Sequence, residues 1–204
     1  MNTKLENEPV FISWDYPTPQ NALDRFVGPG TTHTELLLQL VPTIVITFGF
    51  IAAALINQWG WTAIQLLVAG VLTLDMVGGV ITNATNAGKR WYHRAGQGFR
   101  QHMLFVLVHV AQPLLIMLFF DAGNWTFVLG SYGYLVLASV LILRTPLYLQ
   151  RPLASLLLVL GFFLSLYLLP IPQHFEWFLP VFYTKLLLSH LLREEPYRPV
   201  GEQA

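Results

Sequence analysis

The chain has 204 residues, of which 54% are apolar and only 11% are charged. Its mean hydropathy is positive, and an ordinary soluble domain of this length does not have such a composition. Lys plus Arg equal Asp plus Glu at 11 each, so net charge gives no argument for a nucleic-acid partner, and we predict none. The absence of cysteine excludes disulfides, thiolate metal sites and cysteine nucleophiles.

Residues 1–35 form a polar segment with acidic and turn-forming residues, among them Gly28, Pro29 and Gly30. The segment has neither the apolar core of a signal peptide nor the apolar length of a membrane span. We predict that it is a cytoplasmic N-terminal segment. A transmembrane domain over residues 36–192 and a cytoplasmic tail over residues 193–204 are expected to follow it.

Six apolar runs make up the predicted transmembrane domain. Each approaches the roughly 20 residues that a helix needs to cross about 30 Å of hydrocarbon, although the last two are short. Backbone groups in lipid must bond within their own segment, and the alternation of a barrel strand is absent. The sequence therefore predicts an all-α integral membrane protein with about six transmembrane helices, at residues 36–56, 61–84, 102–120, 126–143, 153–169 and 177–192.

Positive charge is distributed unevenly between these spans. Every Lys and Arg except Lys185 falls in the N-terminal segment, the 88–101 loop, the 144–152 loop or the C-terminal tail. Positively charged loops tend to stay in the cytoplasm, so we predict that the N-terminus and the C-terminus are both cytoplasmic. The small size, the lack of cysteine and the lack of a signal peptide favour the inner membrane of a prokaryote.

Three ionisable residues lie near the centres of predicted spans, at similar depth: Asp75, His109 and Lys185. A charge at the centre of a span costs about 2.5–3.5 kcal/mol on insertion scales, which makes each a functional candidate. We predict that Asp75 pairs with Lys185 and that His109 is close enough to exchange a proton. Alternatively, the pair only neutralises two charges, and His109 bonds a carbonyl across a helix interface.

A polar stripe runs along the second predicted span. Its members are spaced by four, three and four residues and therefore share one helix face: Asp75, Gly79, Thr82 and Asn86. Asn83 lies beside them, and the stripe leads into a loop that contains Arg90, His93 and Arg94. The loop is expected to bind an anionic group such as a lipid phosphate. Helix packing and ordinary positive-inside topology explain the same residues without a ligand.

The third predicted span has a stripe of its own, formed by His102, Phe105, His109 and Gln112 and followed by Pro113. Two facing polar stripes predict a hydrated cleft between the second and third spans. Pro113 is expected to kink the helix at that depth, although proline is also common in membrane helices for packing reasons.

The histidines do not predict a metal site. His102 and His109 are seven residues apart, about 10.5 Å along a helix, which is too far for both to bind one ion. His102 and His190 lie at comparable predicted depth, so opposed ligation of a haem is the one cofactor alternative, although no haem-attachment motif is present. We therefore predict no cofactor.

Three functions remain open from the sequence. The leading interpretation is transport of a solute or proton through a polar cleft between the second, third and sixth spans. One alternative is an intramembrane enzyme that acts on a lipid or polyprenyl substrate at the cytoplasmic face, with Asp75, His102 or His109 as the catalytic group. Another is a subunit or scaffold of a membrane complex. The residues expected to bind the solute or ligand are Asp75, Asn83, Asn86, Arg90, His93, Arg94, His109 and Lys185.

The expected partners are membrane lipids and a small-molecule or lipid ligand. No nucleotide-binding motif is present. The sequence has no convincing internal repeat, so a transporter of this size is expected to work as a homo-oligomer rather than as a two-fold monomer.

Overall fold

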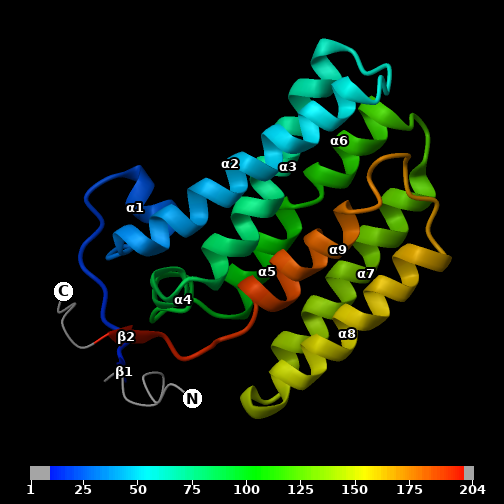
Figure 1. The fold of residues 1–204 in the computed structure, drawn as a ribbon. Helices are drawn as coiled ribbons and strands as arrows, with labels where there is room; N and C mark the ends of the chain where they lie inside the picture. The colour runs from blue at the N-terminus through cyan, green and yellow to red at the C-terminus, as the bar shows by residue number, and fades with distance from the viewer. Residues whose placement is uncertain (1–9, 200–204) are drawn as a thin grey trace, which may run out of the picture.

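Five helices in the described part of the chain are long and apolar enough to cross a membrane. The structure, a computed structural model, describes residues 10–199, and Figure 1 shows the long helices packed into one bundle. The chain is therefore a multi-pass helical protein with a membrane-like architecture. Its long helices are α2 (His33–Ile56), α3 (Ala63–Ala84), α5 (Phe99–Val108) continued by α6 (Ala111–Phe120), α7 (Trp125–Arg144) and α8 (Leu147–Tyr167).

Capping side chains fix where the first long helices begin. Thr32 Oγ1 accepts a hydrogen bond from Glu35 N at 3.1 Å, and the Glu35 carboxylate accepts one from Thr32 N at 3.0 Å. Thr62 and Gln65 form the same reciprocal arrangement at the start of α3. Such boxes satisfy N–H groups that have no partner within the helix. Because of this cap, α2 begins at His33, slightly before the predicted span 36–56.

The last predicted span, 177–192, is a short and central helix. It consists of α9 (Phe178–Tyr183), with six residues, and the π-helix η2 (Thr184–His190), with seven. Thirteen residues extend about 20 Å at 1.5 Å per residue. In Figure 1 this segment runs between α3 on one side and α7 and α8 on the other. Phe178, Phe182 and Leu186 on it are fully buried, as expected for a helix enclosed by others.

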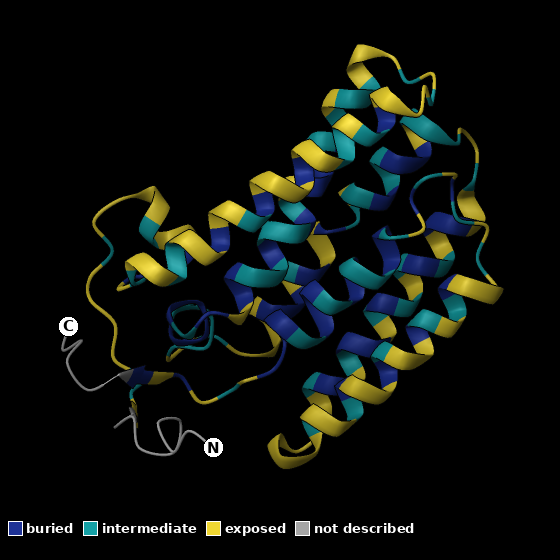
Figure 2. Cartoon of the chain, viewed as in Figure 1, coloured by how far each residue is buried: buried dark blue, intermediate teal, exposed yellow. Residues whose placement is uncertain are grey.

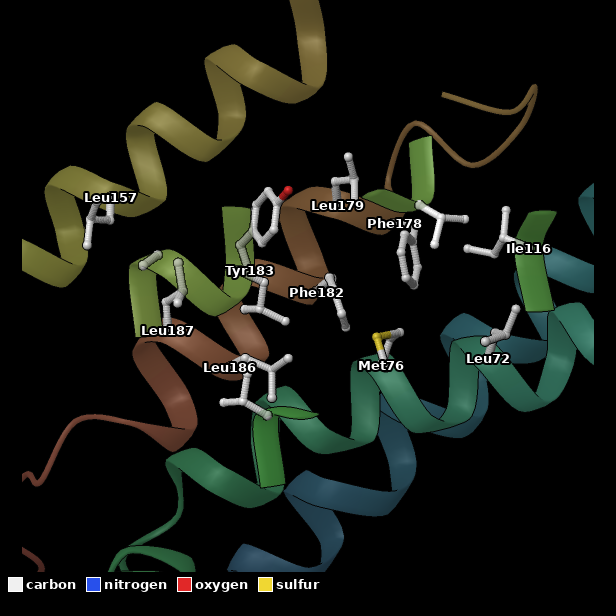
Figure 3. Packing of buried hydrophobic residues seen from close by; sticks show 14 of the residues in the cluster. Leu72, Met76, Ile116, Leu157, Phe178, Leu179, Phe182, Tyr183, Leu186 and Leu187 are labelled. Carbon is white, nitrogen blue, oxygen red and sulfur yellow. The ribbon is translucent and has the colours of Figure 1, made fainter. Parts of the chain in front are cut away.

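An apolar core surrounds α9. Figure 3 shows Met76 and Leu72 of α3 and Ile116 of α6 directed toward Phe178 and Phe182. All five side chains are at most 1% exposed. This cluster fills the half of the bundle that is farther from the chain termini.

The outer faces of the long helices are also apolar. Phe48 on α2 is 70% exposed, Leu129 on α7 67% and Phe163 on α8 57%. Figure 2 shows exposed residues along the outward side of these helices. An apolar surface of this extent suits lipid contact better than water.

One predicted loop is much shorter than expected. The sequence suggested a loop over residues 144–152, but only Thr145 and Pro146 separate α7 from α8. Pro152 lies inside α8 rather than before it. A proline there removes one backbone hydrogen bond, to the carbonyl of Tyr148, whose side chain is exposed. The cost is small enough for the helix to continue through it.

A pair of short strands, which the sequence analysis missed, joins the two ends of the chain. β1 (Val10–Ile12) pairs with β2 (Tyr197–Pro199) in antiparallel register, with Phe11 opposite Arg198. The short helices α1 (Ala22–Val27) and α4 (Asn86–Tyr92) lie at the same end of the bundle (Figure 1). We call this the terminal end. α4 occupies part of the predicted loop 88–101.

Basic residues gather at the terminal end. The described Lys and Arg residues other than Lys185 are all in α1, in α4 or the loop after it, near the ends of α5, α7 and α8, or in the segment after η2. Lys4, which was also assigned to this side, lies outside the described residues. The opposite end carries Asp121 and Glu176 instead.

Candidate functional site

Asp75 and Lys185 form an ion pair inside the bundle, as the sequence predicted. Lys185 Nζ lies 2.7 Å from Asp75 Oδ1 and also donates a hydrogen bond to the Asp75 carbonyl at 3.1 Å. Gln112 Nε2 on α6 donates to Asp75 Oδ2 at 2.8 Å. The Lys185 side chain is 3% exposed, whereas that of Asp75 is 39% exposed. The pair therefore joins α3, α6 and η2, and its carboxylate remains accessible.

Gly79 makes room for the lysine. A Cβ atom at this position would lie 2.3 Å from Lys185 Cε, closer than side-chain contacts allow. Gly79 is one helical turn from Asp75, so the Lys185 stem lies against a bare patch of α3. This contact explains why the stripe on α3 contains a glycine.

The rest of that stripe does not line one cleft. Thr82 Oγ1 donates to Gln39 Oε1 on α2 at 2.9 Å. Asn86 Oδ1 accepts a hydrogen bond from Tyr197 N in β2 at 3.1 Å. Asn83 is buried, and its Nδ2 has no hydrogen-bond partner among the described residues. The predicted polar track along α3 is therefore divided among three different neighbours.

The stripe on the third span has the expected break. The α-helix is interrupted between Val108 and Ala111, and the N–H groups of His109 and Val110 bond three residues back rather than four. Pro113 has no N–H to donate to the His109 carbonyl, which accounts for the interruption. The His109 ring turns back along the helix, with Nδ1 2.6 Å from the Phe105 carbonyl.

Two irregular helices thus meet at the ion pair. One is the broken α5–α6 helix, which provides His109 and Gln112. The other is η2, in which Leu191 N bonds Leu186 O five residues back and which provides Lys185. π-helices and interrupted membrane helices recur at functional sites, because they redirect side chains and free backbone groups.

Three histidines cluster between the ion pair and the terminal end. His102 Nδ1 lies 3.2 Å from His190 Nε2, and His93 Nε2 donates to the His190 carbonyl at 2.9 Å. The His93 and His102 ring centres are 4.6 Å apart. His190 Nδ1 is buried and has no hydrogen-bond partner in the described part of the chain. We call these residues the histidine cluster.

Phe105 separates His109 from the histidine cluster. Its ring stacks on that of His190, with centres 3.8 Å apart and an angle of 15° between the planes. The Phe105 ring centre also lies 4.6 Å from that of His109. A hydrocarbon ring neither donates nor accepts a proton, so Phe105 interrupts an otherwise continuous row of proton-binding groups.

The basic residues of α4 and of the loop that follows it make local contacts within the protein. Lys89 is 2% exposed, and its Nζ donates to the carbonyls of Ser189 and Leu192 and lies 3.2 Å from Glu194 Oε2. Lys89 thereby holds the end of η2, and burial lowers its pKa from the ordinary value. Arg94 lies over the Trp91 ring at 3.6 Å.

Burial also controls the charge state of His93. Loss of solvent, followed by the nearby His102 and Lys89, lowers the pKa of His93 to about 3. His93 is therefore neutral near pH 7 and can donate its Nε2–H to the His190 carbonyl.

The ionisable groups occupy one half of the bundle. Between Asp75 and the loop residues Asp121 and Glu176, the described helices carry no Asp, Glu, Lys, Arg or His. That half contains the apolar core around Phe178. The chain of polar groups thus extends from the ion pair toward the terminal end only.

The structure unites some of the predicted site residues and not others. Asp75, His109 and Lys185 lie around one site, and His93 and His102 lie in the histidine cluster. In this geometry the facing nitrogens of His102 and His190 are within hydrogen-bond distance of each other, so opposed haem ligation would require the rings to separate. The sequence placed Phe105 on the same face as His102 and His109 but did not predict its contact with His190, and it gave Lys89 only as a charge of the cytoplasmic loop.

Comparisons of the chain with protein-family models, with curated proteins and with solved structures gave no match. The function must therefore be argued from the site.

Proposed function

We propose that this protein transports protons, alone or together with a small solute, and that Asp75 is the group that binds the proton. The observation that carries the proposal is the Asp75–Lys185 pair, held by two irregular helices and followed by histidines on one side. A charged residue within a membrane costs free energy, and such residues usually have a function.

The chemistry follows from the two partners. Asp75 Oδ1 accepts a hydrogen bond from Lys185 Nζ, and a proton taken up by this carboxylate would remove the negative charge that faces the ammonium. The lysine would then need a new acceptor, which favours a different arrangement of η2 against α3. Proton binding is thereby linked to helix movement, as transport requires.

We further propose that α9 and η2 together form the sixth crossing, with both termini in the cytoplasm. An even number of crossings agrees with the pairing of β1 with β2, and the basic terminal end agrees with the positive-inside rule. In this orientation the histidine cluster lies on the cytoplasmic side of the ion pair.

Proton flux into liposomes tests the proposal. The purified chain is reconstituted with a pH-sensitive dye inside, and an imposed pH gradient is followed over time. The wild type should dissipate the gradient faster than empty liposomes, and Asp75→Asn, Lys185→Met and His109→Ala should each abolish this. Asp15→Asn and His33→Ala, at exposed positions, are the matched controls.

Two results would contradict transport. Wild-type flux in all three site variants would show that these residues take no part in transport. Absence of flux in the wild type, with any imposed solute, would favour the enzyme or scaffold interpretation. The enzyme interpretation places a phosphate on the arginines that follow the stripe of α3, but Arg90 is only 2% exposed. It is therefore the less well supported alternative.

A further inference from the structure

A second polar site lies at the terminal end, outside the proposed proton path. It is a cavity of about 700 Å³ between the first turns of α8 and the segment that follows η2. Its volume is within the range of small-molecule sites. Two arginines and two glutamates line it: Arg151, Arg193, Glu194 and Glu195.

The charges of this cavity are only partly paired with one another. Arg151 Nε lies 3.7 Å from Glu194 Oε1, and Glu194 also forms an ion pair with Lys89. Within residues 10–199, neither Arg193 nor Glu195 has an ion-pair partner within 4.0 Å. Arg193 instead lies over the Trp14 ring at 4.6 Å. One cation and one anion are thus available to a ligand.

The cavity lies where a membrane lipid would present its headgroup. It borders the point at which α8, a candidate membrane span, begins. Leu147 and Tyr148 on its rim are 56% and 79% exposed, as expected for residues in contact with the membrane interface. On the inner side the cavity is closed by the buried Leu192.

We propose that this cavity binds the headgroup of a phospholipid that carries a phosphate and a primary ammonium, as ethanolamine headgroups do. The arginines bind the phosphate through their paired N–H groups, and the glutamates accept hydrogen bonds from the ammonium. A choline headgroup has no N–H for the glutamates. A glycerol headgroup has no cation and would leave the carboxylates facing a phosphate.

Lipid competition on the full chain tests this proposal. The protein in detergent is given equal amounts of dimyristoyl lipids with ethanolamine, choline and glycerol headgroups, and bound lipid is measured by native mass spectrometry. The ethanolamine lipid should predominate. Arg193→Gln and Glu195→Gln should each weaken its binding about tenfold, since each removes a hydrogen bond to a charged group.

Matched controls and a soluble competitor complete the experiment. Arg100→Gln and Glu176→Gln change exposed residues outside the cavity and should leave lipid binding unchanged. Equal binding of the three lipids, preference for the glycerol lipid, or wild-type binding by both cavity variants would overturn the proposal. Glycerophosphoethanolamine should bind more weakly than the lipid. If it binds as tightly, the ligand is a soluble phosphate ester and not a membrane lipid.

Discussion

Lys185 is stabilised by groups that replace its lost hydration. Its ammonium meets the Asp75 carboxylate and the Asp75 carbonyl, and its stem lies against Gly79. Such a pair does not have to stabilise a protein, because two charges must be desolvated to form it. Removal of only one partner destabilises the protein, because the other charge then stays buried without a counter-charge.

A comparison of single and double variants therefore distinguishes a structural role of the Asp75–Lys185 pair from a functional one. Asp75→Asn or Lys185→Met alone should lower the free energy of unfolding by about 3–5 kcal/mol, the usual cost of an unpaired buried charge, less for Lys185→Met because Asp75 is partly exposed. The double variant should recover most of this loss. Thermal unfolding in detergent, followed by near-UV circular dichroism, measures the stability.

The double variant is then tested for proton flux. If the pair only neutralises charge, the refolded double variant should transport like the wild type. If Asp75 binds the transported proton, the double variant should be well folded but should not transport protons.

Phe105 allows a second test at a single residue. Phe105→Ala should raise proton flux severalfold, because the space left between His109 and His190 can admit water that links the two rings. The initial rate of dye quenching in liposomes reports the change. Phe163→Ala, on the exposed face of α8, serves as the control. An unchanged rate in Phe105→Ala would mean that Phe105 does not limit proton movement.

At the scale of helices, the sequence predicted the spans better than their internal geometry. Long apolar runs fixed α2, α3 and α7 to within a few residues, because a span must have a certain length in lipid. Pro113 indicated the break in α5–α6. The loop predicted at Pro152 was wrong. In lipid, backbone groups without hydrogen bonds are costly, so a helix continues through a proline more often than it does in water. The π-helix and the strand pair depend on contacts between distant residues, so local patterns gave no sign of them.

The same limit applies to the candidate site. The depth of Asp75 and Lys185 along their spans predicted their pairing, since both needed a counter-charge. The position of Thr82 on the same face as Asp75 suggested one shared cleft, but a face of a helix can border two neighbours, and Thr82 bonds α2.

His93, which directly follows the short helix α4, should make the protein sensitive to acid. The pKa of His93 is lowered to about 3, mainly by burial, while the unfolded chain titrates near 6.5. Between these values the unfolded state binds a proton that the folded state does not, so stability should fall as the pH is lowered from about 6.5 toward 3. Melting temperatures measured across this range should show the slope.

A variant identifies how much of the slope belongs to His93. His93→Gln keeps a hydrogen-bond donor for the His190 carbonyl but cannot be protonated, and it should flatten the slope. His33→Gln, at an exposed histidine, should not. Equal slopes in wild type and His93→Gln would assign the acid sensitivity to other groups.

At the scale of the whole molecule, the polar groups make the two ends unequal. The ion pair connects through histidines to the terminal end, whereas the described helices of the other half carry no Asp, Glu, Lys, Arg or His beyond Asp75. The chain has no cysteine, so single cysteines can be introduced without background. A membrane-impermeant maleimide then reports which side reaches each position.

Gln112→Cys should react only from the side that labels Ala95→Cys, an exposed position at the terminal end. Ala122→Cys, exposed at the opposite end, should react only from the other side, and the buried Ser131→Cys from neither. Vesicles of both orientations provide the measurement. Reaction of Gln112→Cys from the Ala122 side would contradict one-sided access. Labelling of Ala95→Cys and Ala122→Cys from the same side would contradict the six-crossing topology.

The pairing of β1 with β2 also has a consequence for biosynthesis. Phe11 leaves the ribosome before α2, and Arg198 leaves it after η2. The pair can therefore form only when all the helices between them have been made, and it joins residues that are far apart in the chain. Until then the segment before α2 has no strand partner on its own chain. Closure of the strand pair thus marks a molecule in which η2 has been translated, which distinguishes a bundle that contains all of the described helices from a partial one.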